Sequence, residues 1–138
     1  MMKNAVLILV FIFLEGLVAQ EIPPIKHYKP QIAFAGNQNW MISQDQKGTL
    51  FMANNKGLLQ FRGTDWKLNT SPNQSIVRSV KVIDEKICVG SYMDFGFWER
   101  HPNGELHYTS LANELNITIL EDEQFWNIID YGEKIIFQ

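Results

Sequence analysis

The chain has 138 residues, with 12 lysines and arginines against 15 aspartates and glutamates and a formal net charge of −3. A mildly acidic chain without a basic cluster lacks the electrostatic footprint of a protein that binds nucleic acid, so we expect none within these residues. The single cysteine, Cys88, excludes an internal disulfide and stands in an apolar strand pattern, where we expect a small buried hydrophobic residue.

Residues 1–19 have the pattern of a secretory signal peptide. Lys3 precedes an unbroken apolar run from Ala5 to Leu14, and the small residue Ala19 follows at the expected cleavage site. The alternative is an uncleaved anchor, but the ten residues of this run fall short of the roughly 20 that a membrane-spanning helix needs. We therefore expect an exported protein of a bacterial envelope, where a repeat domain needs no disulfide framework. Residues 20–35 form a lead-in segment, in which 32–34 are expected to be a strand.

A short phrase occurs about three times in the rest of the chain. Residues 78–89 and 126–137 align without a gap at an offset of 48 positions and share Glu-Lys-Ile, and residues 40–52 are an earlier and looser copy. A repeat of roughly 40 to 50 residues made of short strand patterns is typical of a β-propeller blade. The repeat therefore predicts the fold class before any residue chemistry is considered.

Each copy predicts strands in the same order. First strands are expected at 39–44, 77–83 and 125–131, and nearly continuous apolar runs at 50–53, 87–90 and 135–137 predict second strands buried on both faces. Polar turns containing Asp or Gly separate them. The first two copies continue into third strands at 58–61 and 97–100 and short outer strands at 66–68 and 106–108. Residues 113–120 are expected to form a short helix or a loop.

The expected fold class is all-β, a partial β-propeller of about two and a half four-stranded antiparallel blades after a signal peptide. The incomplete propeller spans 36–138, with blades at about 36–70, 75–110 and 123–138, the last of them truncated. Because propellers usually close with about 4 to 8 blades, we expect the chain to be the N-terminal piece of a longer protein. The alternative is a small open stack of sheets that forms an oligomer.

The first copy resembles the two-component regulator propeller repeat. That motif is a strand, Asp-x-x-Gly, an aromatic-aliphatic strand, then Asn-x-Gly-Leu and an aromatic, and here it is carried by Asp45 to Gly48 and by Asn55 to Phe61. The second copy lacks the Asp-x-x-Gly turn, and its sequence from Val89 to Trp98 resembles the corresponding blade of the triple-tyrosine regulators of Bacteroidetes-type bacteria. The resemblance covers about residues 35 to 138.

The resemblance implies a sensor. In that family an exported propeller precedes a triple-tyrosine domain, a membrane helix and a cytoplasmic output, often a LuxR-type helix-turn-helix and sometimes a histidine kinase. It implies a location on the periplasmic face of a bacterial inner membrane, with a glycan or another small extracellular molecule as ligand. The other implied partners are the remaining blades, the membrane and output domains of the same protein, and a second copy in a homodimer of the full-length protein.

No pattern indicates catalysis, a metal or a cofactor. The three histidines, His27, His101 and His107, have no metal-ligand spacing, and we expect them to be solvated turn residues. The carboxylates of 84–85 lie in a predicted turn and those of 121–123 in a polar run before a strand, and we expect a solvated face rather than acid–base catalysis. Nucleophile-elbow, phosphate-loop and zinc-protease motifs are absent from the sequence. We therefore expect no enzyme activity, no cofactor and no metal.

One group of residues is a candidate ligand site. Trp40, Arg78 and Trp126 occupy equivalent repeat positions near the start of the innermost strand, so blade geometry predicts all three around one end of a central channel. Flat aromatic side chains stack on sugar rings and an arginine binds carboxylates with two parallel hydrogen bonds, which suits an acidic glycan fragment. The alternative is that the three side chains plug the channel or pack between blades.

Two other functions remain open at this point. One is a propeller enzyme that acts on polysaccharide, such as a lyase or glycosidase, with catalytic residues in other blades. The other is a secreted adhesion or scaffolding propeller without an output domain. Further repeats followed by a triple-tyrosine domain and a membrane helix would favour the sensor over both.

Overall fold

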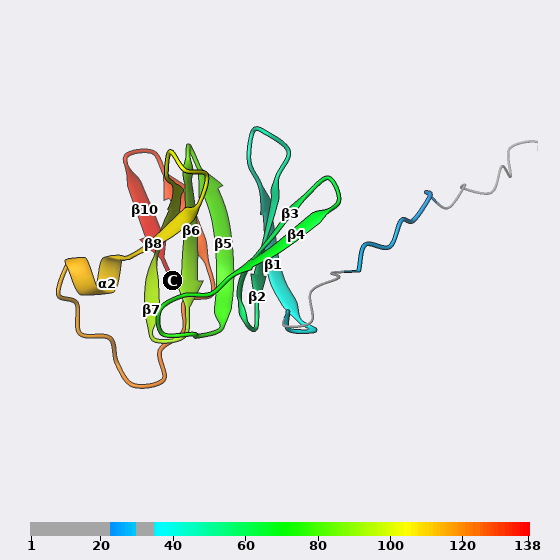
Figure 1. Ribbon diagram of the computed structural model, residues 1–138. Coiled ribbons are helices and arrows are strands. Elements are labelled where there is room, and N and C mark those ends of the chain that lie inside the picture. The colour runs from blue at the N-terminus through cyan, green and yellow to red at the C-terminus, as the bar shows by residue number, and fades with distance from the viewer. Residues whose placement is uncertain (1–22, 30–34) are drawn as a thin grey trace, which may run out of the picture.

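The computed structural model describes residues 23–29 and 35–138, and Figure 1 shows their arrangement. The predicted signal peptide at 1–19 and the predicted strand at 32–34 lie outside the described residues. Within the described residues, no helix is long and apolar enough to cross a membrane.

The chain forms two four-stranded antiparallel sheets and a separate hairpin. The first sheet has the order β1 (Asn39–Gln44), β2 (Leu50–Asn54), β3 (Gly57–Arg62), β4 (Asp65–Asn69). The second has the order β5 (Val77–Ile83), β6 (Lys86–Ser91), β7 (Asp94–Arg100), β8 (Leu106–Ser110). The hairpin pairs β9 (Ile128–Tyr131) with β10 (Lys134–Phe137). The expected all-β class with four-stranded antiparallel sheets is confirmed, whereas the assignment to a propeller stays a prediction.

The first strands of the three units lie beside one another. Strand β5 contacts β1 on one side and β9 on the other, and the second strands β2 and β6 join these contacts. The backbone N–H of Val82 in β5 donates a hydrogen bond of 3.0 Å to the Ser43 hydroxyl in β1. Each unit therefore presents one sheet face to the unit that follows it in sequence.

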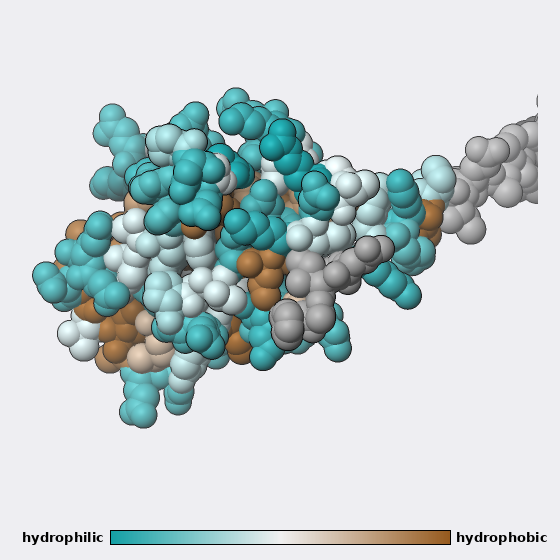
Figure 2. All heavy atoms as spheres, viewed as in Figure 1, coloured by the Kyte–Doolittle hydropathy of each residue, from teal (hydrophilic) through white to brown (hydrophobic). Residues whose placement is uncertain are grey.

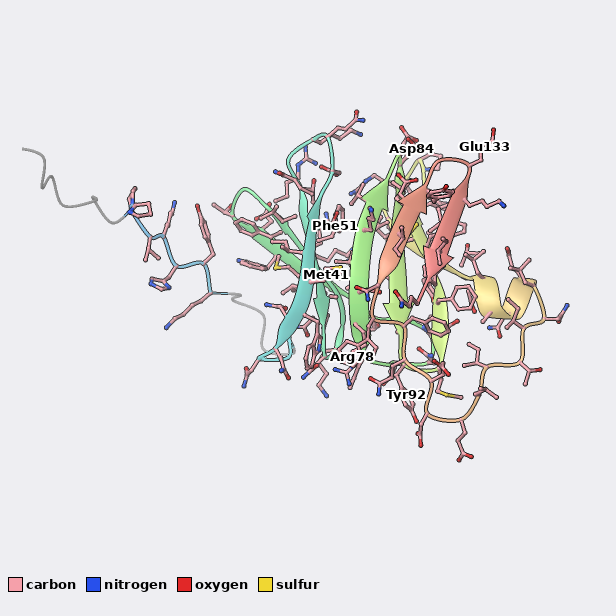
Figure 3. The ribbon with its side chains drawn as sticks, turned by 180° about the vertical axis from the view of Figure 1, so that it is seen from behind. Met41, Phe51, Arg78, Asp84, Tyr92 and Glu133 are labelled. Carbon is pink, nitrogen blue, oxygen red and sulfur yellow. The ribbon has the colours of Figure 1, made fainter. Side chains whose placement is uncertain are left out.

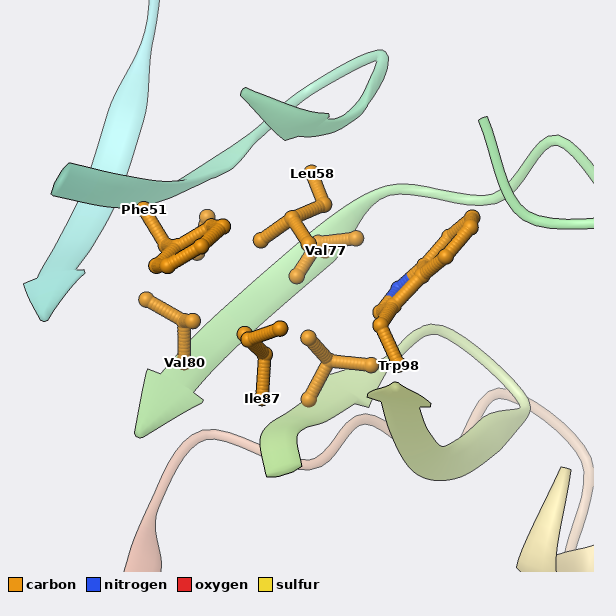
Figure 4. Close-up of a cluster of buried hydrophobic side chains, with 8 residues drawn as sticks. Phe51, Leu58, Val77, Val80, Ile87 and Trp98 are labelled. Atoms are coloured by element: carbon orange, nitrogen blue, oxygen red, sulfur yellow. The ribbon is translucent and has the colours of Figure 1, made fainter. Parts of the chain in front are cut away.

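The hydrophobic core lies between the first and second sheets. Phe51 and Leu58 extend from the first sheet toward Val80, Ile87 and other side chains of the second (Figure 4). The whole cluster consists of Phe51, Ala53, Leu58, Val77, Val80, Ile87, Val89 and Trp98. Because fully burying one large apolar side chain contributes roughly 1.5–3 kcal/mol, this shared core holds the two sheets together.

The turn between β1 and β2 is closed by a carboxylate. Asp45 accepts hydrogen bonds from the backbone N–H groups of Lys47 at 2.9 Å and Thr49 at 2.8 Å. Gly48 has φ +79°, a left-handed conformation that glycine adopts without steric cost. The corresponding turn between β5 and β6 is shorter, with Asp84 at φ +54°.

The helix between the second sheet and the hairpin begins earlier than expected. Helix α2 spans Leu111–Glu114 rather than lying within 113–120. It begins there because the hydroxyl of Ser110 accepts a hydrogen bond of 3.2 Å from the backbone N–H of Asn113 and so caps the helix. In the loop that follows, the hydrophobic residues Leu115, Ile117 and Leu120 are exposed. Figure 2 shows hydrophobic residues gathered around α2, while hydrophilic residues cover the turns at the far ends of the sheets.

The third unit differs from the prediction in two respects. Strand β9 begins at Ile128 and not at 125, because the preceding backbone departs from regular pairing. The apolar run at 135–137 was expected to be buried on both faces, but Ile135 is 39% exposed and Ile136 is 45% exposed. Within the described residues, no further sheet packs against the hairpin in the way that the hairpin packs against β5 and β6.

Candidate ligand-binding site

Trp40 and Arg78 occupy the same irregular position in their sheets. In the first sheet Asn39 pairs with Asn54 and Met41 with Ala53, so Trp40 is an extra residue in the pairing. In the second sheet the register shifts between Val77 and Ser79, which makes Arg78 the extra residue. A β-bulge of this kind bends the strand and turns a side chain in a new direction.

Trp126 lies in the equivalent place before β9. The backbone N–H groups of Trp126 and Asn127 both donate to the carbonyl oxygen of Gln138, at 2.6 and 2.9 Å. Two successive N–H groups bound to one opposing carbonyl are the hydrogen-bond pattern of a bulge. The three residues singled out by the repeat therefore share a backbone irregularity as well as a repeat position.

The structure brings the three side chains into contact. The guanidinium carbon of Arg78 lies 4.5 Å from the ring centroid of Trp40 and 4.6 Å from that of Trp126. The two indole rings are 5.5 Å apart and meet at 85°. Both contacts of Arg78 are within the range of a cation–π interaction, which favours a positive group over an aromatic face. Their convergence is an observation, and their role in ligand binding stays a prediction.

Two amides hold this cluster, which we call the Trp–Arg–Trp site. Arg78 donates from Nε to Oε1 of Gln124 at 2.7 Å, and Trp40 donates from Nε1 to Oδ1 of Asn55 at 2.7 Å. Arg78 forms no salt bridge with any described residue, so the donors of its two terminal amino groups are available to a ligand. Trp40 is 38% exposed and Trp126 is 43% exposed, which leaves aromatic surface open to solvent.

The loop before Trp126 is hydrogen-bonded to the second sheet. The backbone N–H of Met93 donates to the carbonyl oxygen of Glu123 at 2.9 Å, and the hydroxyl of Ser79 donates to that of Phe125 at 2.9 Å. Gly90 permits this close approach, because a Cβ atom there would lie 2.5 Å from the Phe125 carbonyl oxygen. The segment 122–125 is thus fixed beside the Trp–Arg–Trp site by backbone contacts.

Tyr92 links the same loop to the end of β6. Its hydroxyl donates a hydrogen bond of 2.7 Å to Oδ1 of Asp122. This hydrogen bond and the negative charge of Asp122 raise the pKa of Tyr92, with a smaller contribution from Glu121. Figure 3 shows Tyr92 and Arg78 at one end of the molecule and Asp84 and Glu133 at the opposite end. The rim of the site therefore combines one cation with an acidic loop.

This arrangement suits a small ligand with a flat face and a negative group. Exposed indole faces offer stacking surface to a sugar ring, and the terminal amino groups of Arg78 can donate two parallel hydrogen bonds to a carboxylate. Both indoles are partly exposed, so the site is open to solvent. We therefore expect it to bind part of an extended ligand.

Several residues of the site were missed by sequence reasoning. Asn55 and Tyr92 could have been found, because each directly follows the second strand of its sheet and so occupies an equivalent repeat position. Gln124 and Asp122 carry no repeat signal, since they lie in the connection between β8 and β9, which is longer than the one between β4 and β5. Their contacts with Arg78 and Tyr92 span 46 and 30 positions.

A cleft of about 670 Å³ lies at the opposite end, between the turns of the two sheets. Its apolar floor includes Phe51, Val82 and Ile87. The charged residues around it are Asp45, Lys47, Asp84, Glu85, Lys86, Glu99 and Arg100. Acidic and basic groups are nearly balanced, so charge alone selects no class of ligand there.

The histidines and the cysteine form no chemical centre with other residues. His101 and His107 are exposed and stack with ring centroids 4.0 Å apart, a contact that the sequence did not predict. Among the residues that the structure describes, no group of three histidine, cysteine or acidic side chains could hold a metal ion. Cys88 is buried, and burial raises the pKa of its thiol to about 11, which keeps it protonated and unreactive at neutral pH.

No protein-family model, curated protein or solved structure matches this chain.

Proposed function

We propose that this chain is part of a periplasmic, ligand-sensing β-propeller of a membrane-spanning transcriptional or two-component regulator. The observation that carries the proposal is the convergence of Trp40, Arg78 and Trp126 from three successive units. The proposed ligand is an oligosaccharide fragment that bears a carboxylate. In this view the chain binds and does not catalyse.

Two further observations support a propeller. The four-stranded antiparallel sheets follow one another in sequence order, and their first strands lie side by side. The shared bulges direct one side chain of each unit to a common end of these first strands. Such an end is where propellers present residues from several blades to a single ligand.

The proposed mechanism couples binding to the packing of units. Trp40 belongs to the first sheet and Trp126 to the segment before the hairpin, with Arg78 of the second sheet between them. A ligand that touches both indoles and the guanidinium would favour one relative placement of the three units over others. That difference in affinity between placements is the free energy available for signalling.

Calorimetric titration of the 138-residue chain tests the proposal. The probe is a xylo-oligosaccharide that carries one glucuronate, and xylotetraose is its uncharged counterpart. Arg78→Met should weaken binding of the acidic probe about 10- to 100-fold, because a hydrogen bond to a charged group contributes about 1.5–3 kcal/mol. The matched control is Arg62→Met, which removes an exposed arginine from β3 and should leave the affinity unchanged.

The proposal fails if the acidic probe does not bind, or if Arg78→Met and Arg62→Met behave alike. Equal affinity for the acidic probe and for xylotetraose would show that Arg78 does not recognise the carboxylate. A sensor also requires a response, so Arg78→Met in the gene at its native locus should abolish the transcriptional response to the acidic oligosaccharide. Cleavage of the probe during the titration would instead favour a polysaccharide-acting enzyme.

A further inference from the structure

An acidic loop lies beside the Trp–Arg–Trp site. Glu121, Asp122 and Glu123 are consecutive and exposed, and they immediately precede Gln124, the residue that binds Arg78. In the sequence these three carboxylates had the appearance of an ordinary solvated run. The structure instead ties this loop to Arg78 through the hydrogen bond that Arg78 donates to Gln124.

The loop has a defined position. Tyr92 binds the carboxylate of Asp122, and the backbone N–H of Met93 binds the carbonyl oxygen of Glu123. Tyr92 and Gln124 also form an isolated β-bridge. The backbone of the loop and the carboxylate of Asp122 are therefore held beside the second sheet, while the side chains of Glu121 and Glu123 extend into solvent from this fixed backbone.

The charge balance at this rim limits what the site accepts. Arg78 supplies one positive charge, and the loop supplies three negative charges in the residues directly before Gln124, which binds Arg78. A ligand with one carboxylate can pair that group with Arg78 and direct neutral rings toward the loop. A ligand with several negative groups must bring some of them close to the loop carboxylates, and like charges placed together oppose binding.

We infer that the 121–123 loop is a charge filter, which admits ligands with a single carboxylate to the Trp–Arg–Trp site and rejects polyanionic ones. This inference rests on the proposed function, because it assumes that Arg78 receives the ligand's acidic group. It adds a specificity determinant and narrows the ligand class to sparsely charged acidic oligosaccharides.

The test compares one carboxylate with several. The two probes are the xylo-oligosaccharide with one glucuronate and tetragalacturonate, which carries a carboxylate on every ring. The test variant is Glu121→Gln/Asp122→Asn/Glu123→Gln. An asparagine at 122 can still accept the Tyr92 hydrogen bond and tolerates the φ of +64° found there, so the loop should keep its place.

The chain offers a closely matched control. Asp84→Asn/Glu85→Gln/Glu133→Gln also replaces one aspartate and two glutamates, and Asp84, like Asp122, has a positive φ. Asp84 and Glu133 lie at the end of the molecule opposite Arg78 and Tyr92 (Figure 3). Both variants therefore change the net charge equally, at different ends.

The loop variant should bind tetragalacturonate about tenfold more tightly than the native chain, while its affinity for the singly charged probe should change less than about threefold. The gain should shrink at 0.5 M salt, where exposed charges are screened. Adding Arg78→Met to the loop variant should remove this gain in affinity for tetragalacturonate. The control variant should change neither affinity.

Three negative results have different meanings. Arg78-dependent binding with equal effects of the loop and control variants would overturn the charge filter and leave the proposed function intact. An equal gain for both probes would also overturn it, because the loop would then repel any anion. Failure of every variant to bind either probe would overturn the proposed function and the inference together.

Discussion

The first and second sheets share their strand order but differ in the hydrogen bonds that their buried polar groups form. Both have four antiparallel strands in sequence order and a bulge in the first strand, at Trp40 and Arg78. Each also has an aromatic pair between its third and fourth strands. These pairs are Phe61 with Trp66, at 4.4 Å, and Trp98 with Tyr108, at 5.2 Å.

The polar groups buried in the two sheets are not equivalent. At the end of β2, the side chain of Asn54 binds the backbone of Gly36, Gln38 and Lys56 and the side chain of Asn39. Ser91 takes the same position at the end of β6, and its buried hydroxyl has no partner among the described residues.

The second sheet uses a different residue for this purpose. The buried carboxylate of Asp94, at the start of β7, accepts hydrogen bonds from Tyr108 at 2.9 Å and Ser110 at 2.6 Å. The equivalent residue in the first sheet is Gly57, which has no side chain. The two sheets therefore share strand order, bulge and aromatic pair, but they satisfy their buried polar groups with different residues.

The largest expected difference between the sheets is at the aromatic pair. Trp98 is buried in the shared core and Phe61 is half-buried on the outer part of its sheet. Trp98→Ala should lower the free energy of unfolding by about 3–5 kcal/mol, whereas Phe61→Ala should cost about 1 kcal/mol. Urea unfolding followed by circular dichroism measures both. Equal losses would contradict the placement of the core between the two sheets.

Buried polar groups at the second-strand ends should give the next largest contrast. Asn54→Ala should cost about 2–3 kcal/mol, because the substitution removes several hydrogen bonds to partly buried backbone groups at once. Ser91→Ala should change the free energy of unfolding by less than about 0.5 kcal/mol or increase it, since the hydroxyl it removes is buried and unpaired. The same unfolding assay applies. A large loss for Ser91→Ala would reveal a partner for that hydroxyl.

Alkaline pH should weaken the second sheet through Tyr108. Burial, followed by the charge of Asp94 and its hydrogen bond, raises the pKa of Tyr108 well above the ordinary value of 10.0. A raised pKa in the folded state means that stability is complete below pH 10 and is lost as pH rises above it, because the unfolded chain then releases the proton more easily.

Tyr108→Phe tests this effect. At pH 7 the substitution should lower the free energy of unfolding by about 1 kcal/mol, because one hydrogen bond is lost. Above pH 10 the difference in free energy of unfolding between the variant and the native chain should narrow. The buried thiol of Cys88, with a raised pKa of about 11, remains in both proteins and contributes the same alkaline loss above its ordinary value of 9.0. A constant gap across pH 7–11 would argue against a buried, protonated Tyr108.

A small effect on stability is expected at the Trp–Arg–Trp site. Its cation–π contacts are partly exposed, so Arg78→Met should lower the free energy of unfolding by about 1 kcal/mol while it changes the tryptophan emission spectrum. Arg62→Met should leave both unchanged. A loss above about 3 kcal/mol, the range of core substitutions, would instead favour the alternative that the three residues are a packing plug.

Local patterns in the sequence were sufficient to predict most strands of the two complete units. Runs such as Leu50 to Ala53 and Ile87 to Gly90 lie in strands, and the turn residues Gly48 and Asp84 lie where the chain reverses. These features depend on neighbours two to four positions apart, and strand periodicity and turn conformation are decided at that range. The repeat also identified Trp40, Arg78 and Trp126 as equivalent.

Tertiary packing decided what those residues do to one another. The guanidinium of Arg78 reaches both indoles because the first strands of the three units are adjacent and because each of the three residues lies at a bulge. Neither property can be predicted from a strand pattern. Gln124 and Asp122 meet Arg78 and Tyr92 only through a loop that folds back across the sheet. Contacts between residues 30 to 46 positions apart depend on how sheets pack, so the site became visible only in three dimensions.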